Sequence, residues 1–355
     1  MTKKWYPQRK TIDAPIATIK TFIHHIGHPI SRATIEKDIE SHREFPSLSF
    51  EAITEILKDW GMEPIAYKAN LESLPSLPIP SITLIEEIDK RQQMGIPVLF
   101  FGLEQDTVTY VHPRKGWVYE SLADFNAKWS KAMISLTGIT SEGEEDFEEL
   151  EKEYIQKLEN HPERQLVQSM DQVLTADECD HIIAISNDRF ARSKVGGIEE
   201  AIYGRTSYSA YLVIDDDQKL NAIREKIAQR INRPTSHFEY FQCVSYALGQ
   251  EYQNHYDTFD PETEDGRLTI EADGQRKFTL LIYLSDDFEG GQTHFPKLDL
   301  LVTPEKGGAV LFQNIDDDGK LIDSSFHSGL PISRGKKYAL NLWIRERAIK
   351  EVVAS

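Results

Sequence analysis

Apolar residues near the start of the chain recur at helical spacing in two stretches. The first covers residues 16–26 and stops at Gly27, and the second covers residues 50–60 and stops at Gly61. Apolar positions three or four apart lie on one face of a helix, so both stretches are predicted to be amphipathic helices. Short apolar runs follow at 82–84, 98–101, 107–111 and 117–119. We interpret these as strands, and helices followed by a small antiparallel sheet indicate an α+β domain.

A helical pattern also runs through the most acidic part of the chain. Residues 141–164 hold 10 acidic and 3 basic side chains, and the apolar residues Phe147, Leu150, Tyr154 and Leu158 are three or four positions apart. The spacing favours an amphipathic helical linker that follows a loop at 137–143. A disordered acidic spacer is the alternative.

The pattern changes again after this linker. The residues TADE at 175–178 form a capping box for a helix that ends near Asn187, and 217–231 is a second helix. Short strands separated by Gly, Pro and Asp then follow, at 239–247, 278–284, 308–313 and 336–345. Such a series is typical of closed or sandwiched β structures. The predicted organisation is therefore a domain at 1–138, an acidic linker at 139–164 and a second domain at 165–348.

The length and the net charge of the chain limit the number of domains and the classes of partner that it can have. A chain of 355 residues is long enough for two domains. Its 58 acidic and 40 basic residues give a net charge of −18, which argues against nucleic acid and an anionic membrane surface as partners. No signal peptide or run of eighteen apolar residues is present, and two cysteines are too few for a disulfide framework. These features favour a soluble cytoplasmic protein.

The sequence His255-Tyr256-Asp257 is the strongest local sign of a metal site. Alternate residues of a strand share a face, so His255 and Asp257 can offer an imidazole and a carboxylate to one metal. His327 precedes a later strand and would complete the two-histidine, one-carboxylate set of non-haem Fe(II) oxygenases, although zinc or manganese also suits these ligands. His294 is a rival ligand. The pattern His-x-Asp alone arises by chance in many chains.

Lys337 is the candidate for binding a co-substrate. In a strand, Lys337, Ala339, Asn341 and Trp343 would share one face. An inward lysine is costly unless it meets an opposite charge, so Lys337 is placed to hold the distal carboxylate of a dicarboxylic acid. The alternative is a lysine at a strand edge that binds nothing.

From about Leu166 to Arg347 the chain resembles the prolyl 4-hydroxylase branch of the 2-oxoglutarate/Fe(II)-dependent dioxygenases. The motifs that carry the resemblance stand in the family's order: Val244-Ser245-Tyr246, Gly249-Gln250-Glu251-Tyr252, His255-Tyr256-Asp257, Arg276 to Leu284, Phe288 to Pro296, Pro304 to Phe312, His327 to Pro331, and Gly335 to Arg345. No ligand position departs from the family's pattern.

This resemblance implies a double-stranded β-helix, or jelly roll, with supporting helices. It also implies Fe(II) and 2-oxoglutarate as cofactor and co-substrate, O2 as the second co-substrate, and ascorbate as a further candidate. The implied residue roles are Fe(II) ligation by His255, Asp257 and His327, 2-oxoglutarate binding by Lys337, Tyr246 and Thr279, and substrate binding by Trp343 and Arg276. The long acidic segment 258–275 is a candidate lid that would favour a basic peptide, and a solvated loop is the alternative.

Residues 8–136 resemble, more weakly, the C39 cysteine peptidase domain of bacteriocin exporters, which has a papain-like fold. The resemblance lies in residues 13–27, 74–82, 98–101, 111–116 and 125–129. Ala14 occupies the position of the catalytic cysteine, and residues 1–178 contain no cysteine, which excludes thiolate catalysis there. The histidine position falls near residues 96–97, His112 stands where an aspartate is expected, and Gln8 is matched to the oxyanion glutamine.

Together these features predict a 2-oxoglutarate- and Fe(II)-dependent hydroxylase of a peptidyl residue, with proline as the first choice. Exporter C39 domains recognise leader peptides with a double-glycine end, so the first domain is predicted to dock the substrate peptide. A scaffold or dimerisation role is its alternative. Other hypotheses are hydroxylation of a free amino acid or another side chain, and a peptide-binding sensor of oxygen or 2-oxoglutarate with little turnover. The sequence identifies neither the substrate nor the oligomeric state.

Overall fold

The computed structural model describes residues 3–89, 92–193, 204–212 and 217–349. The chain divides into two compact units, Met1–Asn160 and His161–Ser355, which we call unit 1 and unit 2. Each unit has its own sheets and its own buried core, so each is described by itself.

Unit 1 contains a six-stranded antiparallel sheet in the order β1-β6-β2-β3-β4-β5. Its strands are β1 (Met62–Lys68), β2 (Ser81–Asp89), β3 (Gln92–Glu104), β4 (Thr107–His112), β5 (Gly116–Ser121) and β6 (Trp129–Ile139). The predicted strands at 82–84, 98–101, 107–111 and 117–119 are confirmed as β2 to β5. One face of the sheet is packed with large apolar residues, among them Phe100, Tyr110 and Phe125.

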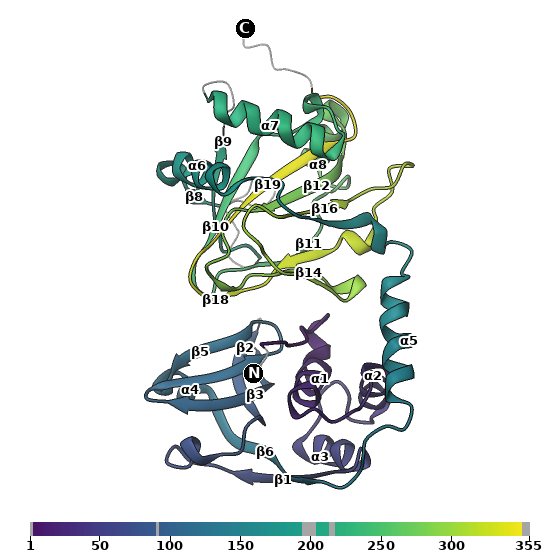
Figure 1. Ribbon diagram of the computed structural model, residues 1–355, viewed down its shortest axis with the longest axis vertical. Coiled ribbons are helices and arrows are strands. Elements are labelled where there is room, and N and C mark those ends of the chain that lie inside the picture. Colours follow the sequence, from purple (N-terminus) through teal and green to yellow (C-terminus); the bar gives the residue numbers. More distant parts are fainter. Residues whose placement is uncertain (1–2, 90–91, 194–203, 213–216, 350–355) are drawn as a thin grey trace. The chain divides into compact units, whose positions relative to one another are not determined.

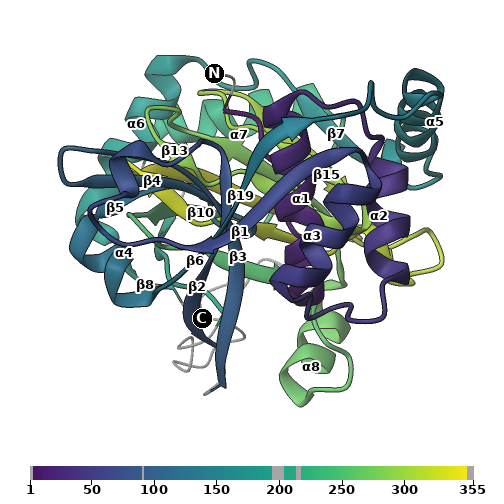
Figure 2. The ribbon, with the colours of Figure 1, turned by 90° about the horizontal axis from the view of Figure 1, so that it is seen from below.

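The helices α1 (Ala14–Ile26), α2 (Arg32–Ser41) and α3 (Phe50–Asp59) lie together beside this sheet (Figures 1 and 2). The two predicted helices are confirmed as α1 and α3. Helix α1 ends at Gly27, whose φ of 71° lies in the left-handed region that favours glycine. The short helix α4 (Leu122–Lys128) precedes β6. Together with the later sheet, these helices give the predicted α+β pattern.

The acidic segment contains the helix α5 (Phe147–Glu159), as its spacing predicts. This helix belongs to unit 1, because Arg32 Nε lies 2.7 Å from Glu151 Oε1 and Tyr154 Oη donates to Glu36 Oε1 at 2.8 Å. The alternative of a disordered spacer is therefore wrong for this helix. The predicted loop at 137–143 is wrong in its first part, because β6 continues to Ile139.

Unit 2 has two larger antiparallel sheets. The major sheet has the order β7-β16-β12-β19-β10-β9-β8 and the minor sheet the order β11-β17-β14-β15. Major-sheet strands are β7 (Val167–Met170), β8 (Ala191–Arg192), β9 (Tyr208–Leu212), β10 (Phe241–Tyr246), β12 (Arg276–Tyr283), β16 (Ala309–Gln313) and β19 (Lys337–Arg345). The other strands are β11 (Tyr252–His255), β14 (Thr293–Phe295), β15 (Leu300–Val302) and β17 (His327–Gly329), with β13 (Glu289–Gly290) paired to β18 (Ile332–Arg334). The four strands predicted in this half are confirmed as β10, β12, β16 and β19.

Two helices, α6 (Ala176–Ser186) and α7 (Gln218–Ile231), cover the outer face of the major sheet (Figure 1). The predicted capping box is present: the Glu178 amide donates to Thr175 Oγ1 at 3.3 Å, and the Thr175 amide donates to Glu178 Oε2 at 2.7 Å. Ile182 and Ile227 bring the helices onto Leu280 and Leu340 of the sheet, all four fully buried.

The inner faces of the two sheets pack on each other. Phe295 of β14 meets Phe312 of β16 edge to face, with ring centroids 5.1 Å apart. Tyr283 of β12 is hydrogen bonded to Thr293 of β14 at 2.8 Å. Contacts between facing sheets of this kind make unit 2 a jelly roll. At one end, the space between the sheets is a pocket.

The acidic segment 258–275 is not a bare loop, because it contains α8 (Glu264–Asp273). The side chain of Gln275 joins its two ends: Oε1 accepts from the Phe259 amide and Nε2 donates to the Phe259 carbonyl, both at 2.8 Å. Arg347 donates to the carbonyls of Ile270 and Glu271 at the end of α8. The segment is thus fastened at its base, and its role as a lid stays a prediction.

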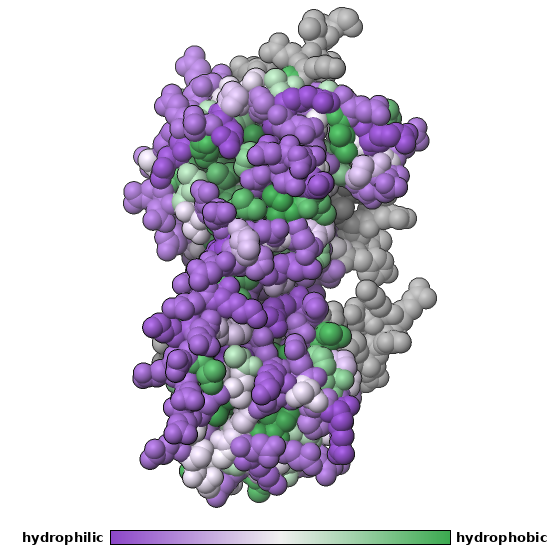
Figure 3. Space-filling view, turned by 90° about the vertical axis from the view of Figure 1, so that its right-hand side faces the viewer, coloured by the Kyte–Doolittle hydropathy of each residue, from purple (hydrophilic) through white to green (hydrophobic). Residues whose placement is uncertain are grey.

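Hydrophilic residues cover most of the face in Figure 3, with hydrophobic residues in small separate groups. Within the described ranges, every helix is too short or too polar to cross a membrane.

Candidate metal centre and co-substrate pocket

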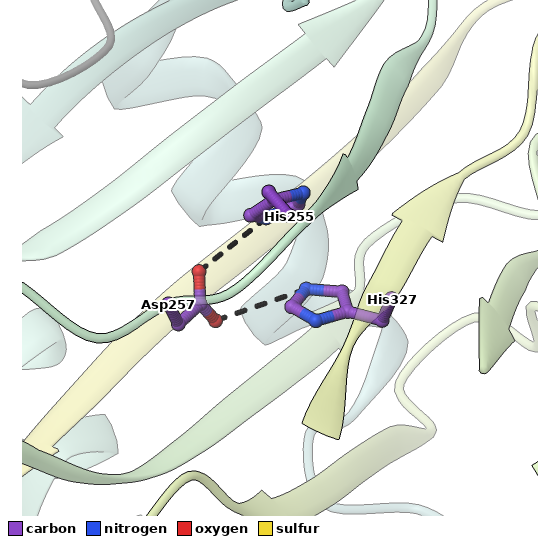
Figure 4. Close-up of side chains that lie close together, drawn as sticks. All are labelled: His255, Asp257 and His327. Atoms are coloured by element: carbon purple, nitrogen blue, oxygen red, sulfur yellow. Dashed lines mark ion pairs between the residues drawn. The ribbon is translucent and has the colours of Figure 1, made fainter. Parts of the chain in front are cut away.

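The pairing of β11 with β17 brings two histidines together. His255 is the last residue of β11, and its register partner is His327, the first residue of β17. Asp257 follows two positions after His255, and the three side chains point toward one another (Figure 4). Their ligand atoms all lie within 4.8 Å of one another. In the part of the chain that the structure describes, no other group of three His, Cys, Asp or Glu side chains is placed to share a metal.

Hydrogen bonds to the backbone aim both imidazoles at Asp257. The Nδ1 atoms of His255 and His327 lie 2.8 Å from the carbonyls of Gln253 and Ser325. Since a carbonyl only accepts, each Nδ1 carries a proton, and in the neutral form of such a ring Nε2 holds the lone pair that can bind a metal. These Nε2 atoms lie 3.5 and 3.8 Å from the two carboxylate oxygens of Asp257.

The charge of the group suits a divalent cation. Burial would raise the pKa of Asp257, but His327, His255 and Arg276 hold it well below its usual range. Burial, together with the neighbouring His255, lowers the pKa of His327 to about 4. At neutral pH the group therefore offers a carboxylate and a neutral imidazole lone pair, which are the forms that bind metals such as Fe(II).

Thr279 of β12 fixes the carboxylate. Its Oγ1 donates to Asp257 Oδ2 at 2.7 Å and accepts from Asn314 Nδ2 at 2.9 Å. Asn314 is completely buried next to β16. Sequence patterns did not point to Asn314, because its partner is a hydroxyl 35 positions away in the chain. Thr279 was expected to assist 2-oxoglutarate; it also lines the pocket, but its hydroxyl is used by Asp257.

The rival ligand His294 lies outside this group. Its neighbour Thr293 lines the pocket and bonds Tyr283, and successive residues of a strand point to opposite faces. His294 in β14 therefore faces away from the three ligands.

Lys337 lies in the same pocket, 3% exposed. Its Nζ donates to the Gly291 carbonyl at 2.6 Å and lies 5.3 and 5.7 Å from the ring centroids of Tyr283 and Tyr246. No carboxylate of the described residues forms an ion pair with it, and burial lowers its pKa to about 7. A buried ammonium without a counter-ion fits a site for an anionic ligand.

The pocket brings together seven of the eight residues for which the resemblance implies Fe(II), 2-oxoglutarate or substrate binding. They are His255, Asp257, His327, Lys337, Tyr246, Thr279 and Trp343. The predicted face of β19 is also confirmed, since Ala339 and Asn341 line the pocket while Leu340 and Leu342 lie in the core beneath the helices.

Arg276 is the predicted residue that does not line this pocket. It forms a double ion pair with Glu239, with both N–O distances 2.8 Å, and its guanidinium lies 3.8 Å from the Trp343 ring centroid. Its Nη1 also donates to the Asp257 carbonyl at 3.3 Å. Arg276 thus supports Trp343 and the metal-binding segment, and its contact with substrate stays a prediction.

Unit 1 has a different set of residues at the positions of a peptidase site. Ala14 is buried at the start of α1. His112 is 1% exposed, its Nδ1 accepts from the amides of Arg114 and Lys115, and its Nε2 lies 3.5 Å from Glu87 Oε1. Burial lowers the pKa of His112 to about 4. Ala14 has no atom that can act as a nucleophile, and the His112 ring is occupied by Arg114 and Lys115, so the peptidase reaction has no nucleophile at this position.

Comparisons with known proteins agree with this division of the chain. Residues 241–345 match the 2OG-Fe(II) oxygenase superfamily, and residues 2–140 match the Peptidase C39 family. Prolyl 4-hydroxylase 5 of Arabidopsis thaliana is 32% identical over 203 residues, which cover 50% of this chain and 67% of that protein. Prolyl 4-hydroxylase 13 of the same plant is 30% identical over 192 residues, 49% of this chain and 68% of that protein. The chain belongs to the prolyl 4-hydroxylase family.

A solved structure is similar as well. The viral collagen prolyl hydroxylase of Paramecium bursaria chlorella virus-1, in complex with 2-oxoglutarate, is 28% identical, with a TM-score of 0.41 over 52% of this chain and 97% of that one. Membership of the prolyl 4-hydroxylase family implies Fe(II), 2-oxoglutarate and O2. The three-ligand group and the buried Lys337 fit an iron and a dicarboxylate.

Replacing Thr279 with Val should weaken metal binding without unfolding the protein. The change removes the hydroxyl that holds Asp257, and loss of such a supporting contact raises a metal dissociation constant by about 10- to 100-fold. Anaerobic titration with Fe(II), without 2-oxoglutarate, measures this constant. Thr293→Val is the matched control, because the Thr293 hydroxyl bonds Tyr283 and not the ligands. Equal dissociation constants for the two variants would contradict the role of Thr279.

Proposed function

We propose that this prolyl 4-hydroxylase family member hydroxylates a peptidyl residue, with proline as the first choice, using Fe(II), 2-oxoglutarate and O2. The observation that carries the proposal is a single pocket that holds both the three-ligand group and a buried lysine without a counter-ion. The relatives in Arabidopsis thaliana are named for hydroxylation of proline, which supports this residue as the target.

Different residues of the pocket bind the metal and the co-substrate. His255, Asp257 and His327 hold the iron, and Lys337 binds the distal carboxylate of 2-oxoglutarate beside Tyr246. The bound iron and co-substrate supply the oxidising chemistry: O2 gives one oxygen atom to the substrate C–H bond and the other to succinate, with release of CO2. The protein contributes the ligands, the orientation and the exclusion of water.

The charges of the pocket favour a peptidyl residue over a free amino acid. A free amino acid carries a carboxylate that needs a cation. Among the residues that line the pocket, Lys337 is the one Lys or Arg, and 2-oxoglutarate would occupy it. In a peptide this carboxylate is replaced by a neutral amide. Exposed aromatic rings on the same unit, Tyr211 at 58% and Tyr240 at 57%, offer apolar contacts that suit a proline-containing chain.

A sensor with little turnover is less well supported. Binding alone would not require two imidazoles, a carboxylate and a lysine to converge on one pocket. The complete ligand set, with the hydrogen bonds that hold each member, is what turnover needs.

Changing His255 to Ala should abolish hydroxylation while the fold remains. The variant loses one of three metal ligands, so peptide-dependent succinate formation in the presence of Fe(II) should fall to background, at least about 100-fold below the wild type. Far-UV circular dichroism checks the fold. His161→Ala, a change outside the pocket, should leave turnover intact. Unchanged succinate formation in His255→Ala would refute the ligand assignment.

Binding of 2-oxoglutarate should weaken as the pH rises above about 7. The free protein has a Lys337 pKa of about 7, and a bound carboxylate raises it, so each binding event above that pH takes up one proton. The dissociation constant should rise by about tenfold per pH unit there and stay flat below it. Anaerobic titration with Fe(II) saturating measures this. Lys337→Arg keeps its charge, so its profile should be flat; a flat wild-type profile would show that Lys337 does not titrate on binding.

We also infer that unit 1 is a papain-like domain that docks a leader peptide and presents the rest of the substrate to the pocket. Its match to the Peptidase C39 family supports the fold, and Ala14 in place of a nucleophile allows binding without cleavage. We propose 1–138 as this domain, 165–348 as the oxygenase, and 139–164 as the connecting segment, whose helix α5 packs on unit 1. Docking at a second site would raise the effective concentration of substrate at the pocket.

A peptide substrate that carries a double-glycine leader should bind the full-length protein better than the same peptide without it. Tethering predicts a KM lower by on the order of 100-fold. The free leader, added in trans, should raise the KM of the long substrate and leave that of the short one unchanged. Equal KM values for the two substrates would leave unit 1 with a scaffold or dimerisation role.

A further inference from the structure

Three polar side chains cross the major sheet in one row beside the pocket. Gln242 of β10 is the register partner of Tyr211 on β9 and of Asn341 on β19. All three lie on the pocket side, because Val244 shares a face of β10 with Gln242, and Val244 and Asn341 line the pocket. Tyr211 is 58% exposed and Gln242 is 2% exposed, so the row runs from the surface into the unit.

Arg205 sets the direction of the Gln242 amide. The guanidinium of Arg205, 4% exposed, donates through Nη2 to Gln242 Oε1 at 3.0 Å and through Nε to Ser207 Oγ at 3.0 Å. A guanidinium has no acceptor atom, so only the oxygen of Gln242 can face it. The other end of the amide, Nε2, then points to Tyr211 and donates to its Oη at 2.8 Å.

The direction of the Gln242 amide decides which atoms of Asn341 and Tyr211 are left to donate or accept a hydrogen bond. Gln242 Oε1 also accepts from Asn341 Nδ2 at 3.1 Å, which leaves Asn341 Oδ1 as an acceptor without a hydrogen-bond partner among the described residues. Tyr211 Oη already accepts from Gln242, so its own proton is available to a ligand. The row therefore presents a fixed acceptor at the pocket and a fixed donor at its exposed end.

These two groups do not match 2-oxoglutarate. Its keto and carboxylate oxygens only accept hydrogen bonds, so an amide oxygen at Asn341 repels them, whereas Lys337 attracts them. A peptide backbone offers what the row lacks: an N–H for Asn341 Oδ1 and a carbonyl for the Tyr211 hydroxyl.

We propose that Asn341 and Tyr211 bind the backbone of the peptide substrate, with their polarity set by Arg205 through Gln242. This inference rests on the proposed function. It adds a specificity rule: the N–H that meets Asn341 comes from a residue other than proline, because a prolyl nitrogen in a peptide has no hydrogen. Substrates should therefore need a non-proline residue near the target, and an unbroken run of prolines should bind poorly.

The decisive variant is Gln242→Glu, because a glutamate side chain has the same shape as the glutamine that it replaces. A carboxylate at this position still accepts from Arg205 and Asn341, but it cannot donate to Tyr211. The Tyr211 hydroxyl then donates its hydrogen bond to the carboxylate and can no longer donate to the peptide. Gln242→Glu should thus reproduce the effect of Tyr211→Phe, a variant that removes an exposed hydroxyl and leaves the packing intact.

The measurement uses the full-length protein with a synthetic Ala-Pro repeat peptide. We expect Tyr211→Phe and Gln242→Glu each to raise the peptide KM by about 3- to 10-fold, the cost of one hydrogen bond. The double variant should be no worse than either single one. The KM for 2-oxoglutarate and succinate formation without peptide should stay at wild-type values.

A second comparison tests Asn341. In the wild type, N-methylation of the alanines should raise the peptide KM, and Asn341→Leu should remove that difference. The inference would be overturned if the effects of Tyr211→Phe and Gln242→Glu were additive, or if either variant also raised the KM for 2-oxoglutarate. It would also be overturned if the wild type gave equal KM values for the plain and the N-methylated peptide. If the wild type hydroxylates no peptide, the proposed function fails and the inference fails with it. If the wild type hydroxylates the peptide and the variants have the same peptide KM as the wild type, only the inference fails.

Discussion

The site depends on one buried carboxylate. Asp257 is 8% exposed and stays ionised because two imidazoles and an arginine lie close to it and Thr279 donates to it. Burying a charge in this way is costly unless partners surround it, and the partners come from β11, β12 and β17. The register of both sheets therefore has to hold for the carboxylate to be tolerated, which links folding of the jelly roll to formation of the metal group.

The sequence was sufficient to predict most of the site. Alternation along β19 placed Lys337 and Trp343 in one pocket, and His-x-Asp with a distant histidine named the three ligands. The second layer could not be predicted. Asn314 reaches Asp257 only through Thr279, and the stacking of Arg276 on Trp343 depends on three-dimensional packing that no spacing in the chain encodes.

The fold was predicted where patterns were strong and missed where they were weak. Helix α3 buries four apolar residues on one face, whereas α2 buries only Ile35 and Ile39 and escaped notice. Strand β1 was also missed. It lies at the edge of the sheet of unit 1, where only Met62 is buried, so its alternation is faint. Both elements are held by neighbours and not by their own amphipathic faces.

The two hydrogen bonds between the Gln275 side chain and the Phe259 backbone have an evolutionary consequence. One side-chain amide closes residues 260–274 into a loop whose ends meet at Phe259, two positions after the ligand Asp257. Insertions, deletions or new charges within that loop can be absorbed without moving the strands that carry the ligands. The length and charge of this segment can therefore differ between related chains while the strands that carry the metal group keep their places.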